Sequence, residues 1–190
     1  AVSFSPASQR ASSSLSMAID DMAGSTMPLK SFDPLGLATL GSDTTLTWFR
    51  AAELKHSRVA MLATTGYIVQ ASGWHFPGML SKDVSFESLS TMKPFDAWDA
   101  VPDLGKQQII GFIFLAEIIS EANGTHYLKG GDLPGVIGGV PLTTVDEEKM
   151  KYKRDSELNN GRLAMISIMS FAAAANIPGS VPVLSGSPMF

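Results

Sequence analysis

The stretch ELKHSRVAM, residues 53–61, decides the fold, because a second copy, ELNNGRLAM, follows at residues 157–165. Glu, Leu, Arg, Ala and Met recur at matching positions of the two copies. Each copy leads into a long apolar stretch, and the helical segment between them is unrelated to either. Two matching helices separated by an unrelated one indicate a pair related by a pseudo-two-fold axis.

Three segments of the chain have helical character. We expect helices over about 45–73, 103–123 and 148–176, separated by loops rich in Gly and Pro. No convincing strand alternation is present, so the fold class is all-α. Residues 1–30 are assigned to an N-terminal tail, and residues 31–190 to a single domain.

The tail and the overall composition set limits on function. Residues 1–18 are rich in Ser and carry Arg10 but no acid, which is typical of a plastid transit peptide or its remnant and equally of a disordered polar tail. The formal net charge of -4 gives no electrostatic case for nucleic acid. The absence of Cys excludes disulfides, zinc–thiolate sites, iron–sulfur clusters and thiol catalysis.

Hydropathy leaves two kinds of helical bundle open. None of the three segments contains 18 uninterrupted apolar residues, so a soluble bundle is one of the two. Helices of these lengths could nevertheless cross a hydrocarbon core of about 30 Å, at about 1.5 Å per residue. A membrane bundle requires the charges near the helix starts to be compensated.

The duplicated motif offers that compensation. Glu53 and Arg58 are about 500° apart around one helix, so they pair poorly within it. Across a two-fold axis, Glu53 would reach Arg162 and Glu157 would reach Arg58, and each carboxylate would keep one free oxygen. An unpaired charge in a bilayer is costly, so this arrangement favours three transmembrane helices, with the first and third crossing closely. Small residues should line that crossing: Ala60, Ala63 and Gly66, facing Ala164, Ser167 and Ser170.

The spare oxygens indicate a further ligand. Mg²⁺ prefers oxygen, and the magnesium of a chlorophyll needs one axial ligand, which a Glu oxygen, a His nitrogen or an Asn amide oxygen can supply. A Glu–Arg pair is neutral overall, so it can ligate a neutral pigment without leaving net charge in lipid. The motif is therefore compatible with chlorophyll binding.

The duplicated E-L-x-H/N-x-R-x-A-M signature, together with FDPLGL at residues 32–37, resembles the light-harvesting chlorophyll-binding family over most of the chain after about Leu29. The GWHFPG loop at residues 73–78 and the compact length are similar to its red-lineage branch. That branch comprises the fucoxanthin or peridinin chlorophyll a/c proteins of diatoms, haptophytes, dinoflagellates and relatives.

The resemblance implies roles for individual residues. It implies five chlorophyll magnesium ligands: Glu53, His56, Glu117, Glu157 and Asn160. Arg58 and Arg162 would complete the interhelical ion pairs. Gln70 and Gln108 are further candidate ligands; a polar helix end facing lipid headgroups is the alternative for Gln70, and the spacing of Gln108 from Glu117 departs from the family by one residue. FDPLGL would help to hold one carotenoid end.

The resemblance also implies cofactors, partners and location. The cofactors would be chlorophyll a, chlorophyll c, fucoxanthin- or peridinin-type and diadinoxanthin-type carotenoids, and lipids. The partners would be a photosystem I or II core, neighbouring antenna subunits and thylakoid lipids, and the protein would be no enzyme. It would be a multi-pass protein of the plastid thylakoid membrane.

The loop charges give an orientation independently. The loop at 123–156 carries five basic residues: Lys129, Lys149, Lys151, Lys153 and Arg154. The loop at 74–105 carries only Lys82 and Lys93. The positive-inside rule places the first loop in the stroma and the second in the lumen, so the N-terminus would be stromal and the C-terminus lumenal.

Three alternatives remain open from the sequence. Glu53-x-x-His56 is also the Glu-x-x-His spacing of di-iron carboxylate bundles, although the second copy has Asn160 and each copy brings an Arg. A photoprotective relative that dissipates excitation would have nearly the same ligands. A small three-helix transporter or assembly factor would be colourless.

Overall fold

Three long helices dominate the structure, a computed structural model that describes residues 22–30, 32–122, 126–129 and 146–184, apart from the side chains of Thr39 and Glu147. They are α2 (Asp43–Ala71), α5 (Asp103–Ala122) and α6 (Glu147–Asn176). These described residues form no strand, only an isolated bridge between Met79 and Ser85. The expected all-helical class is confirmed for this part of the chain, with α2 beginning and ending two residues earlier than expected.

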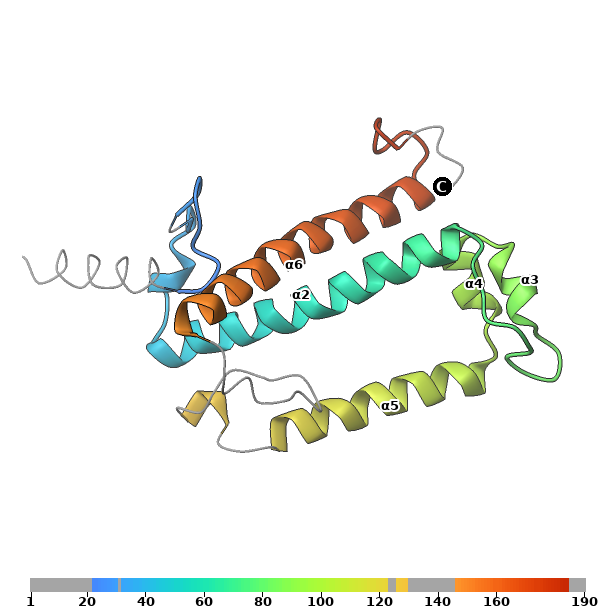
Figure 1. Ribbon diagram of the computed structural model, residues 1–190, viewed down its shortest axis with the longest axis horizontal. Coiled ribbons are helices and arrows are strands. Elements are labelled where there is room, and N and C mark those ends of the chain that lie inside the picture. The colour runs from blue at the N-terminus through green and yellow to red at the C-terminus, as the bar shows by residue number, and fades with distance from the viewer. Residues whose placement is uncertain (1–21, 31, 123–125, 130–145, 185–190) are drawn as a thin grey trace, which may run out of the picture.

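Within the described ranges, four short elements were not expected from the sequence: η1 (Leu37–Thr39), α3 (Phe86–Ser90), α4 (Pro94–Ala100) and η2 (Tyr127–Lys129). Local signals explain two of them. The side chain of Ser85 accepts a hydrogen bond from the Ser88 amide, which caps α3, and Pro94 opens the first turn of α4. Both short helices lie at one end of the molecule, between the end of α2 and the start of α5 (Figure 1).

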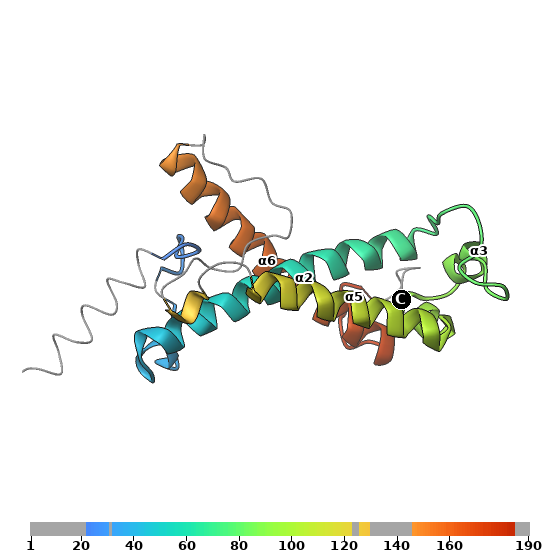
Figure 2. The same ribbon diagram turned by 90° about the horizontal axis from the view of Figure 1, so that it is seen from below.

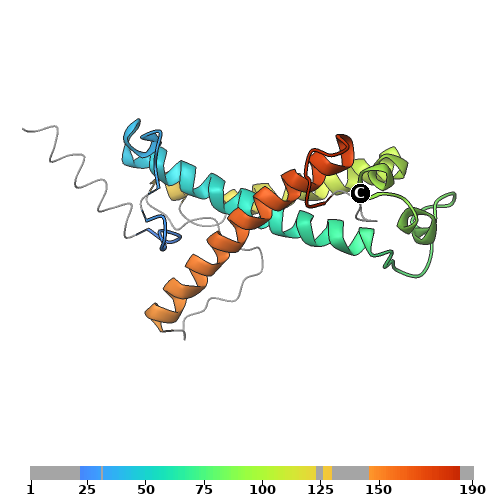
Figure 3. The same ribbon diagram turned by 90° about the horizontal axis from the view of Figure 1, so that it is seen from above.

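The core of the protein is the crossing of α2 and α6, which pack on each other more extensively than any other pair of elements (Figure 3). The buried residues at its centre occupy matching positions of the two motif copies: Leu54, Ser57 and Ala60 on α2, and Leu158, Gly161 and Ala164 on α6. A Cβ atom at Gly161 would lie 2.3 Å from the Cβ of Ser57, so the helices touch here. The duplicated motif therefore forms the contact between the two helices.

The contact line does not follow the predicted stripe of small residues throughout. Ala63 and Gly66 are exposed, so that part of the prediction is wrong. Each step of three residues along a helix turns the side-chain direction by about 60° away from the partner helix, so a run of such steps leaves the contact. A step of four residues turns the direction back toward the partner helix. It passes through Thr64, whose hydroxyl donates to the Ala164 carbonyl, to Tyr67, whose ring centroid lies 5.1 Å from that of Phe171.

Helix α5 has a different environment. It runs alongside α2 (Figures 1 and 2) but makes few direct contacts with α2 or α6, and none of its residues is buried. Its large apolar side chains are exposed to a substantial degree: Leu104, Ile109, Ile110, Phe112, Ile113, Phe114, Leu115, Ile118 and Ile119. Within the described residues, no helix is both long enough and apolar enough to cross a membrane.

Candidate functional site

Two ion pairs join α2 and α6 at the crossing. The Nε of Arg58 lies 2.7 Å from Oε1 of Glu157, and the Nε of Arg162 lies 2.8 Å from Oε1 of Glu53. All four side chains are partly buried. Each arginine thus neutralises a carboxylate on the other helix, which is the cross-paired arrangement described above from the motif.

The two carboxylates differ in their remaining oxygen. Oε2 of Glu53 is bound by Nη1 of Arg50 at 2.7 Å, so the expectation that each glutamate keeps one free oxygen is wrong for Glu53. The reason is local, because Arg50 lies three residues before Glu53 on the same helix face. For Glu157, no second partner is present in the part of the chain that the structure describes.

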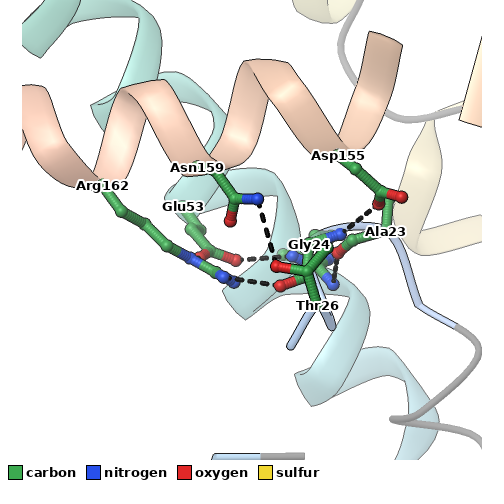
Figure 4. Close-up of polar contacts among 8 residues, drawn as sticks. Ala23, Gly24, Thr26, Glu53, Asp155, Asn159 and Arg162 are labelled. Atoms are coloured by element: carbon green, nitrogen blue, oxygen red, sulfur yellow. Dashed lines mark hydrogen bonds and ion pairs between the residues drawn. The ribbon is translucent and has the colours of Figure 1, made fainter. Parts of the chain in front are cut away.

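A segment that precedes η1 packs on this crossing (Figure 4). Arg162 donates to the Gly24 carbonyl at 2.7 Å, and Arg50 donates to the Ala23 carbonyl at 2.5 Å. The Gly24 amide donates to Asp155 at 2.6 Å. The predicted tail over residues 1–30 therefore includes a stretch that contacts the centre of the molecule.

His56 and Asn160 are held in the same way at matching positions. Nδ1 of His56 lies 2.8 Å from the carbonyl oxygen of Ala52, and Nδ2 of Asn160 donates to that of Ser156 at 2.8 Å. A carbonyl oxygen only accepts, so Nδ1 of His56 carries a proton, and in the neutral ring Nε2 keeps its lone pair. Both side chains are exposed, and among the described residues nothing binds Nε2 of His56 or Oδ1 of Asn160. Each therefore presents one acceptor atom outward from its helix.

Glu117 belongs to a charged cluster between α2 and α5. Nζ of Lys55 lies 2.6 Å from Oε2 of Glu117 and also binds Glu121. Glu121 is bound in turn by Nε2 of His126 at 2.7 Å, and Nδ1 of that ring accepts from the Leu128 amide. Oε1 of Glu117 has no partner within the described ranges.

Gln70 and Gln108, the two further candidates, line one pocket of about 590 Å³ between the end of α2 and the start of α5. Most of its other lining is apolar, including Val69, Leu80 and Phe112. Nε2 of Gln70 donates to the Leu89 carbonyl at 2.6 Å, which leaves the amide oxygen as the acceptor.

The FDPLGL segment forms a capped turn. Oδ1 and Oδ2 of Asp33 accept hydrogen bonds from the amides of Leu37 and Ala38, both at 2.9 Å. Phe32 lines a second pocket, of about 770 Å³, together with Pro28, Arg162 and Ile166. The segment therefore borders a cavity at the crossing.

These acceptor atoms are separate from one another. No group of three or more His, Asp or Glu side chains in the described part of the chain could hold a metal ion, whereas a di-iron centre needs such a group. A metal ion that is already held in the plane of a ring-shaped ligand needs only one further ligand atom from the protein. A single acceptor atom on the face of a helix can supply that atom.

Comparison with known proteins decides the family. The family described as "Chlorophyll A-B binding protein" matches residues 18–176. The chain belongs to this family. The predicted resemblance is thereby confirmed, and the protein is a chlorophyll-binding protein of the light-harvesting type.

Several curated relatives of this chlorophyll-binding protein are similar over most of their length. A fucoxanthin-chlorophyll a-c binding protein A of Phaeodactylum tricornutum is 37% identical, covering 88% of this chain and 86% of that protein. One from Trieres chinensis is 34% identical, covering 97% and 93%. One from Chattonella marina var. antiqua is 37% identical, covering 90% and 77%. These relatives are named chloroplastic, which supports a plastid location.

Sequence reasoning on this chlorophyll-binding protein missed Arg50, Lys55 and Asp155. A signal for Arg50 was present, because Arg50-x-x-Glu53 is repeated as Arg154-x-x-Glu157. The contacts of Lys55 and Asp155 carried no such signal, since they depend on how α5 and the N-terminal segment lie against the motif.

Proposed function

We propose that the protein is an antenna that binds chlorophyll a, chlorophyll c and a fucoxanthin-type carotenoid and passes excitation energy to a photosystem. The observation that carries this proposal is that α5 runs beside α2 with none of its residues buried, while α2 and α6 offer outward-facing acceptor atoms. A helix with exposed apolar side chains on all sides needs apolar material around it. Bound pigments and lipid supply that material, and the names of the relatives support the pigment classes.

The chlorophyll ligands in this proposal are single side-chain atoms. Nε2 of His56, Oδ1 of Asn160, Oε2 of Glu157 and Oε1 of Glu117 each have a free lone pair, and each belongs to a residue whose other polar atom is held by a protein partner. Such support fixes a ligand's orientation and tautomer. Glu53 is the fifth ligand, and it would need Arg50 to release Oε2.

The pocket of about 590 Å³ supports further pigment binding at Gln70 and Gln108. Both amides border the same apolar space. Because Nε2 of Gln70 donates to the Leu89 carbonyl, the side-chain oxygen of Gln70 remains available as a ligand atom. The pocket beside FDPLGL would receive one end of a carotenoid.

The chain itself performs no reaction in this function. The pigments absorb light and transfer excitation, and the protein sets their spacing, orientation and environment. A pseudo-two-fold axis through the crossing would relate His56 to Asn160 and Glu53 to Glu157. The contact of Ser57 with Gly161 and that of Tyr67 with Phe171, both between matching positions, support this relation.

With pigments bound, the protein would lie in the thylakoid membrane as a multi-pass protein, with helices α2, α5 and α6 crossing it. The charges at the crossing form pairs, so their cost in lipid is smaller than that of four single ions. The basic residues of the first turns of α6, together with Lys129, support a stromal N-terminus and a lumenal C-terminus. Its partners would be a photosystem core, neighbouring antenna subunits and thylakoid lipids.

Refolding of the full chain in mild detergent with chlorophyll a, chlorophyll c and fucoxanthin tests the proposal. An antenna should bind all three, and excitation of fucoxanthin should produce chlorophyll a fluorescence with a lifetime of nanoseconds. A colourless product would contradict pigment binding. Strong binding with a short lifetime would instead identify a protein that dissipates excitation.

A further inference from the structure

Lys55 belongs to the motif but takes no part in the ion pairs between α2 and α6. It follows Glu53 by two residues, which is about 200° around the helix, so its side chain points away from α6 and toward α5. There its ammonium group contacts Glu117 at 2.6 Å and also Glu121. The matching residue of the second copy, Asn159, instead reaches Thr26 of the N-terminal segment. The two copies therefore use this position for different partners.

Glu117 has no other cation in the described part of the chain. The basic residue that α5 itself carries is Lys106, eleven residues earlier, which is about 16 Å along the helix, and it lies near Asp103. Arg58 and Arg162 bind Glu157 and Glu53 on the far side of α2. A carboxylate that faces apolar pigments and lipid needs a counter-charge, because a single ion is costly there.

We propose that Lys55 is the counter-ion of Glu117, and that it holds Oε2 of that carboxylate so that Oε1 faces the magnesium of a chlorophyll. This inference rests on the proposed function. It makes Lys55 a positioning residue and gives the α5 ligand a counter-charge, as the arginines do for the carboxylates at the crossing. The second carboxylate on Lys55, that of Glu121, also contacts Nε2 of His126, so Lys55 is not its sole partner.

The test is full-chain refolding with chlorophyll a, chlorophyll c and fucoxanthin, followed by counting of chlorophylls per protein. Lys55→Gln should lose one chlorophyll per chain and its absorption band. Lys106→Gln removes the same charge from a lysine on α5 that does not contact Glu117, so it is the matched control and should keep the full number.

A rescue separates charge compensation from a merely structural contact. Glu117→Gln keeps an amide oxygen for the magnesium but carries no charge, so it should bind that chlorophyll with a shifted band. If Lys55 acts as a counter-ion, Lys55→Gln combined with Glu117→Gln should bind as many chlorophylls as Glu117→Gln alone. Lys55→Arg should also restore binding, because it restores the charge.

Two results would overturn the inference: a full chlorophyll count in Lys55→Gln, or a double variant as deficient as Lys55→Gln. Both would leave the proposed function intact, since the unaltered chain would still bind pigments in the same experiment. Failure of the unaltered chain to bind chlorophyll would overturn the proposed function itself.

Discussion

At the scale of single residues, the tightest point of the protein is the contact between Ser57 and Gly161. The hydroxyl of Ser57 is fully buried and has no hydrogen-bond partner among the described residues. Such a group reduces stability, whereas its small size permits the close approach of α2 and α6. The duplicated motif predicted a close crossing, and the buried residues show which positions form it.

Gly161→Ala should destabilise the protein by about 1–3 kcal/mol, because the added methyl group would overlap Ser57 and force the helices apart. Thermal unfolding of the pigmented protein, followed by circular dichroism, measures the loss. Gly111→Ala on α5 is the matched control, since a Cβ there meets nothing within 4 Å. Equal melting temperatures of the two variants would contradict the tight contact.

Arg58→Leu should remove one chlorophyll and about 3 kcal/mol of stability, because Glu157 would lose its cation at the crossing. Pigment count and melting temperature are the measurements. Arg154→Leu, on the same helix at an exposed position, provides the comparison. Full pigmentation and an unchanged melting temperature in Arg58→Leu would show that the cross-pairing is unimportant.

At the scale of helices, α2 and α6 each present one outward-facing acceptor atom at the same position of the motif, from different side chains. His56 and Asn160 each bind the carbonyl four residues earlier and leave one acceptor atom free. The sequence predicted both residues as ligands, but it did not predict that each side chain is held by the carbonyl oxygen four residues earlier. The repeated Arg-x-x-Glu spacing was a signal for the contact of Arg50 with Glu53, but spacing alone does not decide it, because Arg154 and Glu157 have the same spacing and form no such pair among the described contacts.

His56→Asn should keep its chlorophyll, because the amide can donate to the Ala52 carbonyl and present its oxygen as Asn160 does. His56→Leu should lose that chlorophyll without loss of helix content. Pigment analysis together with far-ultraviolet circular dichroism distinguishes the two variants. Retention of the pigment by His56→Leu would exclude His56 as a ligand.

At the scale of the whole molecule, the described residues form one crossing of packed helices, α2 and α6, and a third long helix, α5, none of whose residues is buried. The three long helices were predictable from apolar segments and breakers. The short helices α3 and α4 were not predicted, although Ser85 and Pro94 mark their starts. The position of α5 could not be derived, since no repeat relates it to the other helices and the ion pairs that join it to α2 among the described residues come from Lys55, which carried no signal in the sequence.

Extraction of the pigments should therefore affect the helices unequally. We expect the amides of α5 to exchange with deuterium much faster after extraction, because this helix has no buried residues of its own. Amides of α2 and α6 near the crossing should keep more of their protection, since they bury Leu54, Leu158 and Ala164. Uniform loss of protection along all three helices would contradict this picture.

The contact of Ser57 with Gly161 has a consequence for sequence variation. The two positions share a space that holds one small side chain but not two, so their volumes are coupled. Exchanging the residues, with Ser57→Gly and Gly161→Ser together, should be tolerated far better than Gly161→Ser alone. Among relatives, a residue larger than glycine at one position should therefore be accompanied by glycine at the other, so these two sites are expected to covary.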